Sequence, residues 1–396
     1  MRHSTTFSKP VKRPLVVSAV AFSLSLGVVE AAECPAEGLR APPGYYLMAD
    51  ENPLQEYVCP TVEPHTGSMN FTSKYEGSDA SRDELNTEAE AEYRAAVENI
   101  RTLEKAVIAA ANDYQIDGDG ALARECVLQL LDSWGSSDAM VTDDINGTGQ
   151  AVRKWALAAI ANGYLRVTLP KPEAITDPDR QQRIKGWFAR LSQGVQAYYS
   201  DRPLEKVNNH DYWAAWAVAA TAVVSNDCAR WNWSMAKFDE AMGQISGEGY
   251  LPNELSRETR ALEYLNYAMQ PLATLATWAQ VNQQPLYDTY HPEFQKLAGN
   301  VVDGLNDPSI IASLTGFEQV TDGLYTSWSL AWLDPWQAGE ELLPGMQTLM
   351  DMYRPLKSTR LGGDLTWLYA VQLVEEKPQP PGKVRVNEKE KPGGKK

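Results

Sequence analysis

Hydrophobic residues recur every three or four positions over most of the chain, beginning near Thr87. This spacing places apolar side chains on one face of an α-helix. The first series is Tyr93, Val97, Ile100, Leu103 and Val107. Comparable series occupy residues 120–134, 148–167, 178–199, 210–225, 233–245, 253–280, 291–304, 337–352 and 363–373. The alternation typical of strands is hardly present, so the pattern predicts an all-α fold.

Short clusters of Gly, Pro, Asn and Asp separate these predicted helices. Helices of moderate length joined by short connections pack as antiparallel hairpins. No internal sequence repeat is visible, so periodicity alone does not predict whether the hairpins curl around an axis.

The first 31 residues have the pattern of a secretory signal peptide. A basic head precedes an apolar run from Leu15 to Val29, and the small residues Ala31 and Ala32 follow. A membrane anchor is the alternative, but the run contains three serines and is short for a span of about 20 residues. We expect removal of residues 1–31, no membrane attachment afterwards, and a periplasmic or secreted protein.

The predicted helical domain spans residues 32–376, and its first part differs in composition from the rest. Residues 32–70 are rich in Pro and Gly, which predicts an extended N-terminal arm lying on the helices. Residues 377–396 combine Pro, Gly and positive charge and predict a disordered tail. Four cysteines allow one or two disulfides in an oxidising compartment, with the pairing open: Cys34, Cys59, Cys126 and Cys228.

The formal net charge of −16 is unevenly spread. Residues 1–31 carry +3 and residues 377–396 carry +5, so the body between them carries −24. Such a body repels nucleic acid, and a polyanionic ligand would have to be held by a local cationic cleft. The 12 Trp and 18 Tyr suit a sugar-binding cleft.

The segment from Pro252 to Ala268 carries the most informative polar pattern. Five side chains fall on one face of its predicted helix: Asn253, Arg257, Arg260, Tyr264 and Tyr267. A solvated polar face is the alternative, but such faces usually carry Lys and Glu. The combination of Arg and Tyr favours a functional surface.

A second polar cluster, residues 208–213, opens an apolar helix. Asn208 is a suitable N-cap, and His210 and Trp213 fall on one face behind it. A lone histidine is more often structural than catalytic, so its role stays open on the pattern alone.

Motifs for metal or nucleotide chemistry are absent from the sequence. There is no HExxH pair, histidine cluster or Gly-rich phosphate loop. The string from Asp117 to Gly120 is similar to a calcium loop, but the matching register ends at Cys126 where a bidentate Glu is needed. We expect no metal and no cofactor, and a helix-to-helix turn at this string.

Six strings along the chain resemble the alginate lyase family, the poly(mannuronate) lyases of polysaccharide lyase family five. They are PPGYY (42–46), FTSKYEGSD (71–79), NGTGQAVRKWAL (146–157), NNHDYWAAWAVAATAV (208–223), GYLPNELSRETRALEYLNYA (249–268) and RLGGDLT (360–366). The resemblance implies an α/α toroid, an incomplete α/α barrel of antiparallel helical hairpins around a central cleft.

The resemblance also implies the residues of an active site. Its catalytic set matches Asn209, His210, Arg257 and Tyr264. The predicted substrate-binding residues are Lys74, Tyr75, Asn146, Thr148, Trp213, Arg260, Tyr267 and Arg360. Among these, Lys74 would belong to a lid and Trp213 would stack on a sugar ring.

Two strings depart from the family pattern. Residues 146–150 read NGTGQ where many members read NHTGK, and residues 264–268 read YLNYA where they read YHNYA. Both changes remove polar or basic groups near the cleft. The preference for mannuronate, its acetylated form or another polyuronate such as polyglucuronate therefore stays open.

The implied reaction is β-elimination in a 4-linked polyuronate, most simply polymannuronate or alginate. Asn209 and Arg257 would share the charge of the substrate carboxylate. Tyr264 would act as the acid, and either Tyr264 or His210 as the base, with a neighbouring Arg favouring the Tyr264 phenolate.

Two rival interpretations belong to other functional classes. A toroidal glycoside hydrolase would need a pair of carboxylates, which the strongest motifs lack. A noncatalytic polyuronate-binding protein would have no use for both His210 and Tyr264. The sequence thus predicts an enzyme whose partner is an anionic polysaccharide, not nucleic acid or membrane, acting as a monomer.

Overall fold

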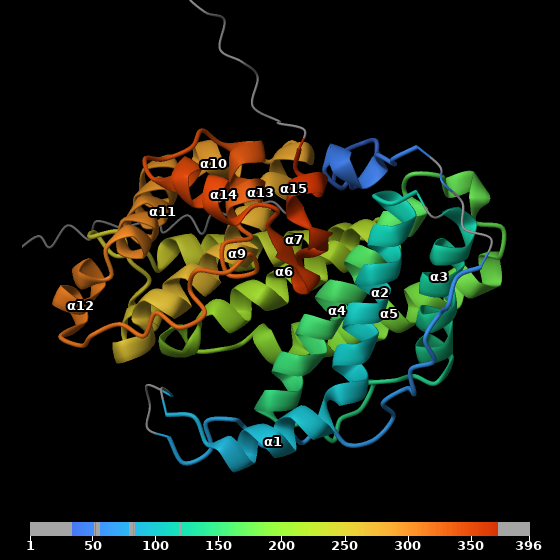
Figure 1. The fold of residues 1–396 in the computed structure, drawn as a ribbon, viewed down its shortest axis with the longest axis horizontal. Coiled ribbons are helices and arrows are strands. Elements are labelled where there is room, and N and C mark those ends of the chain that lie inside the picture. The colour runs from blue at the N-terminus through green and yellow to red at the C-terminus, as the bar shows by residue number, and fades with distance from the viewer. Residues whose placement is uncertain are drawn as a thin grey trace, which may run out of the picture. The chain divides into compact units, whose positions relative to one another are not determined.

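The computed structural model describes residues 34–370 except 51, 53–55, 79–81, 83 and 119. The predicted signal peptide and the predicted tail therefore lie outside the described residues. Within the described part the chain is mostly helical (Figure 1). No helix there is long and apolar enough to cross a membrane.

The α-helices follow one another with short connections. They are α1 (Thr87–Ala96), α2 (Glu98–Gln115), α3 (Gly120–Ser136), α4 (Gly147–Thr168), α5 (Pro178–Tyr199), α6 (Asn209–Ser225), α7 (Cys228–Gly243), α8 (Pro252–Leu255), α9 (Ala261–Val281), α10 (Leu286–Thr289), α11 (His291–Asn306), α12 (Ser309–Thr315), α13 (Leu333–Gly339), α14 (Met346–Tyr353) and α15 (Leu365–Leu368).

Short 3-10 helices and one small sheet complete the described part. The 3-10 helices are η1 (Pro43–Tyr46), η2 (Pro172–Ala174), η3 (Leu204–Lys206), η4 (Glu258–Arg260) and η5 (Thr359–Leu361). The strands β1 (Lys357–Ser358) and β2 (Gly363–Asp364) pair antiparallel.

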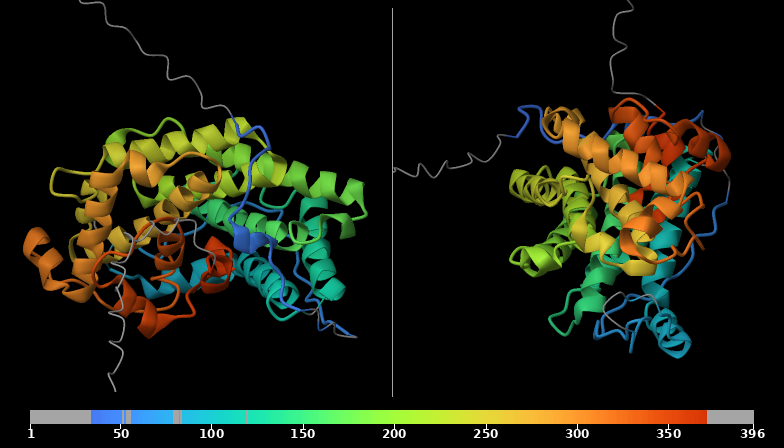
Figure 2. Two further views of the ribbon diagram at one scale, coloured as in Figure 1. Left: turned by 90° about the horizontal axis from the view of Figure 1, so that it is seen from above. Right: turned by 90° about the vertical axis from the view of Figure 1, so that its left-hand side faces the viewer.

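Helix α6 lies at the centre of the core. It packs against α4, α5, α7 and α9, and nearly all its residues are buried. Its sequence is apolar on every side, which is typical of a helix enclosed by others. Figures 1 and 2 show the neighbouring long helices arranged around it as hairpins.

Side-chain caps explain where several long helices begin. Asn146, Asp177, Asn208 and Asp227 each accept a hydrogen bond from a backbone N–H in the first turn of the next helix. Each cap satisfies a donor that has no partner within the helix. The cap at Asn208 also fixes the position of the cluster that opens α6.

Several predicted helices are shorter or more divided than expected. The series at 87–107 is split at Val97 into α1 and α2, and the one at 337–352 into α13 and α14 around Gly345, whose φ is 87°. The series at 253–280 forms α8, η4 and α9, because Glu258 adopts a φ of 51°. At 363–373 only α15 is helical among the described residues.

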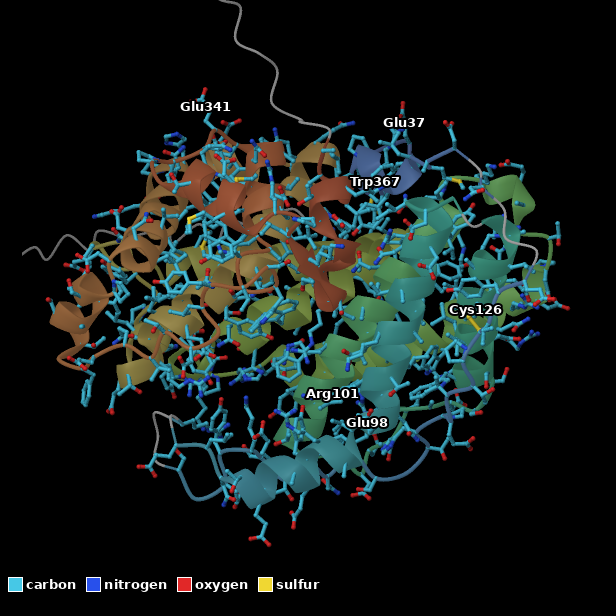
Figure 3. All side chains as sticks on the ribbon, in the orientation of Figure 1. Glu37, Glu98, Arg101, Cys126, Glu341 and Trp367 are labelled. Atoms are coloured by element: carbon cyan, nitrogen blue, oxygen red, sulfur yellow. A yellow bond between two sulfur atoms is a disulfide. The ribbon has the colours of Figure 1, made fainter. Side chains whose placement is uncertain are left out.

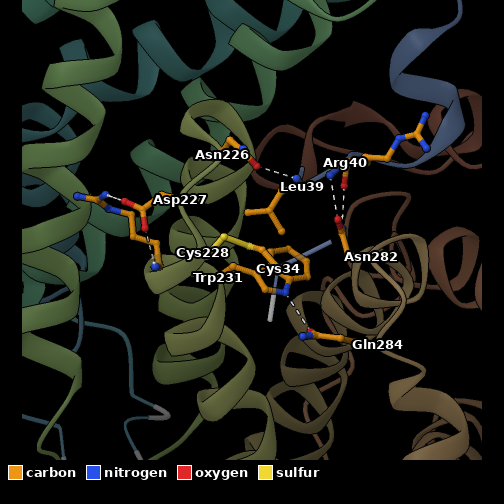
Figure 4. Close-up of a disulfide and its surroundings, with 10 residues drawn as sticks. Cys34, Leu39, Arg40, Asn226, Asp227, Cys228, Trp231, Asn282 and Gln284 are labelled. Carbon is orange, nitrogen blue, oxygen red and sulfur yellow. Dashed lines mark hydrogen bonds and ion pairs between the residues drawn. A yellow bond between two sulfur atoms is a disulfide. The ribbon is translucent and has the colours of Figure 1, made fainter. Parts of the chain in front are cut away.

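The arm, defined as the described residues 34–69, lies on the helices and is covalently attached to them. Cys59 is bonded to Cys126 on α3, which Figure 3 labels, and Cys34 to Cys228 at the start of α7 (Figure 4). These bonds settle the pairing that the sequence left open. All four cysteines are thus disulfide-bonded.

The arm crosses the start of α4 at Gly149. Met69 forms a parallel bridge with Ile145, and a Cβ atom on Gly149 would lie 1.9 Å from the Met69 carbonyl oxygen. Only glycine leaves room for this crossing. The residues that follow Met69 are thereby directed toward the same region as the start of α6.

The string similar to a calcium loop is a turn between α2 and α3, as expected. Gly118 and Gly120 have φ values of 72° and 73°, and the Gly118 carbonyl accepts a hydrogen bond from Asn52. Within the described part of the chain, no group of three or more His, Cys, Asp or Glu side chains is placed to hold a metal ion.

Candidate active site

A cleft of about 1600 Å³ separates the lid, defined as residues 70–78 with α1, from the ends of α4, α6 and α9. Figure 1 shows α1 as a strip along the lower edge, opposite these helices. Ten of the twelve predicted site residues line the cleft: Lys74, Tyr75, Asn146, Thr148, Asn209, His210, Arg257, Tyr264, Tyr267 and Arg360. Of the other two, Arg260 binds the lining residues Tyr75 and Glu263, and Trp213 lines a smaller pocket together with Tyr267 and Arg360.

The Asn209 amide is held by a buried carboxyl group. Its Nδ2 donates to Glu254 Oε1 and Oε2 at 3.1 and 3.0 Å, and its backbone N–H donates to Oε1 at 2.5 Å. Both residues are fully buried. Burial raises the pKa of Glu254 to about 7, although the hydrogen bonds from Asn209 act to lower it. Glu254 thus orients Asn209 at the wall of the cleft.

His210 rests against a buried lysine. Lys154 Nζ lies 2.8 Å from His210 Nδ1 and also donates to Tyr199 Oη at 3.2 Å. The ring centroids of His210 and Trp155 are 5.6 Å apart. Burial, with the nearby Lys154 charge adding to it, lowers the pKa of His210 well below its ordinary value. The imidazole is therefore neutral.

Two guanidinium groups lie over the Tyr264 ring. Arg257 Cζ is 4.7 Å and Arg260 Cζ 5.6 Å from the ring centroid. Burial nevertheless raises the pKa of Tyr264 well above 10, because its effect exceeds the opposing effect of the two arginines. The two arginines favour the phenolate, as expected, but burial outweighs them, and the phenol is protonated in the cleft without substrate.

The lid is fastened to the floor of the cleft through Arg260. Arg260 Nη1 donates to Tyr75 Oη at 2.6 Å, while Nε and Nη2 bind both oxygens of Glu263 at 2.7 and 2.6 Å. Lys74 Nζ lies 4.8 Å from the centroid of the Tyr75 ring. Burial, together with the charge of Arg260, lowers the pKa of Lys74.

Arg360, in η5, also lines the cleft. Its Nη1 donates to Tyr267 Oη at 3.2 Å, and its Cζ lies 4.1 Å from the Trp155 ring centroid. Arg360 therefore connects the η5 segment to rings on α4 and α9. Burial raises the pKa of Tyr267 to about 12, which keeps this phenol neutral.

The prediction that Trp213 stacks on a sugar is wrong. Only 1% of Trp213 is exposed, and its ring lies 5.1 Å from that of Tyr267, which covers it. Trp213 supports Tyr267 from behind. Two indoles with exposed surface line the cleft, the partly exposed Trp155 and Trp328, which is 48% exposed, and the sequence analysis missed both.

Asn146 and Thr148 lie where α4 begins, beside the lid. The Asn146 side chain accepts from the N–H groups of Phe71 and Gly149 at 3.3 and 2.9 Å and donates to the Phe71 carbonyl at 2.9 Å. These bonds attach the start of the lid to α4. Asn146 thus has a structural function in addition to its place on the cleft wall.

Three further residues that matter to the site were not predicted: Lys154, Glu254 and Trp155. The strings quoted for the resemblance contain all three. A detectable signal was the charged pair Arg153 and Lys154, which interrupts the apolar pattern of α4. Burial of such a group demands partners, which is a reason to look for a functional contact.

The cleft concentrates positive charge in an acidic protein. Arginines and lysines contributed by the lid, α2, the loop after α5, the 253–260 segment and η5 converge on it: Lys74, Arg101, Arg202, Arg257 and Arg360. Their joint position agrees with the local cationic cleft that the net charge of −16 requires for a polyanion.

Comparison with known proteins decides the family. The alginate lyase family model matches residues 70–311, which include the lid, α6 and α9. This chain belongs to the alginate lyase family. Membership makes it an enzyme of the polysaccharide lyase class and confirms the resemblance to alginate lyases.

Relatives in the alginate lyase family match nearly the whole chain. An alginate lyase of Pseudomonas paraeruginosa is 39% identical over 338 residues, which are 85% of this chain and 92% of the relative. An alginate lyase of Azotobacter vinelandii is 38% identical over 362 residues, covering 90% and 96% of the two chains.

Solved alginate lyases share the fold. Alginate lyase A1-III from Sphingomonas species A1 has a TM-score of 0.67 at 24% identity, covering 80% of this chain and 88% of that one. An alginate lyase from Bacteroides ovatus has a TM-score of 0.54 at 14% identity, covering 79% and 89%. The predicted all-α toroid is confirmed. A form of alginate lyase A1-III has also been solved in complex with a tetrasaccharide.

Proposed function

We propose that this chain cleaves a 4-linked polyuronate, most simply the polymannuronate of alginate, by β-elimination that leaves 4,5-unsaturated uronate ends. The main support is the convergence of Asn209, His210, Arg257 and Tyr264 on one wall of a cationic cleft. These residues supply donors for a carboxylate and a phenol for proton transfer. They come from two helical segments that the sequence separates.

The first requirement of the reaction is to make the C5 proton acidic. The adjacent carboxylate must accept negative charge as the proton leaves, so donors aimed at it stabilise the transition state. Arg257, just before η4, and Asn209, at the start of α6, are assigned this role. Asn209 takes it once one Nδ2 hydrogen turns from Glu254 to the substrate. Glu254 positions Asn209 through the hydrogen bonds described above.

The second requirement is proton transfer at C5 and at O4. In the enzyme–substrate complex the Tyr264 phenolate removes the C5 proton, the C4–C5 double bond forms, and the C4–O4 bond breaks. The phenol so formed gives this proton to the departing O4, which restores the phenolate beside Arg257 and Arg260. His210 is the alternative base.

The lid supplies the third requirement, a closed environment. Lys74 and Tyr75 face the catalytic wall from the opposite side, and the Arg260–Tyr75 hydrogen bond spans the cleft. Closure over a bound polymer would exclude water and strengthen each electrostatic contact. Thr148, Asn146, Tyr267 and Arg360 are assigned to substrate binding along the same cleft.

The two disulfides support the proposed cellular location. Paired cysteines persist in oxidising compartments, which supports a periplasmic or secreted protein whose residues 1–31 are a signal peptide. The proposed active species is a monomer of residues 32–376 followed by a tail.

The testing experiment incubates purified protein with polymannuronate, polyguluronate and polyglucuronate while the ultraviolet absorbance of unsaturated uronate ends is followed. We expect the absorbance to rise with polymannuronate, and to rise equally with a chelator present, because side chains carry the proposed chemistry. A rise with polyglucuronate alone would instead support the related polyglucuronate lyase.

Two other outcomes would contradict the proposed lyase function, and a third would contradict its metal-free mechanism. New reducing ends without ultraviolet absorbance would indicate hydrolysis. Binding of the polymers without cleavage would indicate a noncatalytic polyuronate-binding protein. Activity that is lost with a chelator and restored only by calcium or zinc would contradict the metal-free mechanism.

A further inference from the structure

Lys154 is a fully buried lysine directly behind the catalytic wall, and none of its close contacts is a carboxylate. Its Nζ contacts His210 Nδ1 at 2.8 Å and Tyr199 Oη at 3.2 Å. It also lies 4.4 Å from the Trp155 ring centroid and 5.2 Å from that of Tyr199. Two aromatic faces and two acceptors therefore surround the amine, an arrangement that stabilises an ammonium group.

The contact with His210 restricts the position of the imidazole proton. An ammonium group has three donors and no acceptor, so the nitrogen it contacts must accept. A neutral imidazole carries one proton, and Nδ1 is occupied as an acceptor. The proton must then be on Nε2. Since His210 lines the cleft, its N–H is available to a bound substrate.

We propose that Lys154 is a positioning residue that fixes His210 as a hydrogen-bond donor, with Nδ1 accepting from Lys154 and Nε2–H directed to the uronate carboxylate. This inference rests on the proposed lyase function and deepens it. A His210 so held has no free acceptor for the C5 proton. His210 joins Asn209 and Arg257 as a donor, and Tyr264 is left as both base and acid.

The charges around His210 agree with a neutral donor. Lys154 approaches from α4, Arg257 from the segment before α9, and Arg202 and Arg82 from the loops on either side. Their charges all oppose protonation of the imidazole. The carboxylate of the next residue, Asp211, is paired with Arg202 at 2.5 Å.

The opposite arrangement would follow if Lys154 were an uncharged amine. Its nitrogen would then accept a proton from Nδ1–H, and Nε2 would carry a lone pair suited to a base. Burial, with the charges of Arg360 and Arg202 adding to it, lowers the pKa of Lys154 well below its ordinary value, whereas the two aromatic faces and two acceptors around Nζ favour the ammonium form. The two arrangements differ in which imidazole nitrogen is protonated, which is directly measurable.

The decisive experiment is nuclear magnetic resonance of the full protein containing ¹⁵N-labelled histidine. Two-bond proton–nitrogen spectra report the protonation of each ring nitrogen, and the His210→Gln variant identifies the His210 signals. We expect a protonated Nε2 and an unprotonated Nδ1 at pH 7. A protonated Nδ1 would overturn the proposal, and this measurement requires no variant of Lys154.

Two substitutions test the consequence for catalysis. Lys154→Met keeps the length and removes the donor, and should lower kcat about tenfold with a smaller change in KM, because the imidazole is no longer held. Lys154→Glu offers an acceptor to Nδ1 and should move the proton there, with a loss of about 100-fold. Lys185→Met on α5, away from the cleft, is the matched control.

The outcomes separate this inference from the proposed function. If Lys154→Met leaves both the His210 spectrum and kcat unchanged, Lys154 is only structural and the inference fails. If the wild-type tautomer is as expected but no unsaturated product forms, the proposed function fails alone. Should the Lys154 variants not fold, the wild-type spectrum still decides the tautomer.

Discussion

Arg260 Nη1 and Tyr75 Oη are 2.6 Å apart, although 185 residues separate them in the chain. The hydrogen bond joins the lid to the segment that precedes α9. Arg260 is held in place by both oxygens of Glu263, so its position is fixed independently of the lid. The contact is therefore a fastening point that can open without disturbing the floor of the cleft.

Substitution of Tyr75 by Phe should loosen the lid. Only the hydroxyl is lost, and a hydrogen bond to a charged group at a half-exposed site contributes about 1 kcal/mol. We expect KM to rise about fivefold with little change in kcat. Steady-state kinetics with Tyr353→Phe as the control would measure this, and an unchanged KM would show that the contact does not hold the lid.

The Tyr264→Phe variant should bind polymer but turn it over slowly. Proton transfer is typically worth 10²- to 10⁴-fold, and we expect kcat to fall by about that factor. The control is Tyr267→Phe, one helical turn away, which loses its hydrogen bond from Arg360 and should chiefly raise KM. Near-normal kcat in Tyr264→Phe would show that another group carries out the proton transfer.

Trp213→Ala should act on stability and not on sugar binding. The side chain is buried behind Tyr267, and removal of a buried Trp costs about 3–5 kcal/mol. We expect a large drop in the urea midpoint of unfolding. Trp155→Ala, at the partly exposed ring, should instead raise KM. A stable Trp213→Ala protein with weakened polymer binding would instead support the prediction that Trp213 stacks on a sugar ring.

Glu254 should make stability depend on pH. Its pKa is raised to about 7 in the folded protein, above the ordinary value of 4.5, so the folded state binds the proton more tightly than the unfolded state. Stability is then greatest below pH 4.5 on account of this group and falls as pH rises through 7, by up to roughly 3 kcal/mol.

Glu254→Gln removes that titration. The difference in unfolding free energy between variant and wild type, measured by urea denaturation from pH 5 to pH 8, should therefore change with pH. Glu248→Gln, at an exposed position, is the control. A pH-independent difference for Glu254→Gln would contradict the raised pKa.

Much of the fold was predictable because the helices are amphipathic or wholly apolar over long runs. The boundaries of α4, α5 and α6 follow from their Asn and Asp caps, which the sequence displays. The division of the 253–280 series was not predictable, since no glycine or proline marks the positive φ at Glu258.

The residue types identified the candidate site, but they did not indicate which of its side chains are buried. A Trp next to a catalytic motif gives no indication whether its ring faces the cleft or the core. Trp213 was therefore predicted to contact the sugar, and Trp155 was not. Lys154 and Glu254 act through neighbours that are distant in sequence. Such contacts depend on how α4, α6 and α8 pack, which periodicity does not specify.

The disulfide between Cys59 and Cys126 changes what happens when the lid opens. It anchors the arm a short run of chain before Lys74, and α2 anchors the other end of the lid. The segment between is therefore a closed loop with both ends attached. Reclosure is a unimolecular event at a high effective concentration, independent of how dilute the enzyme becomes.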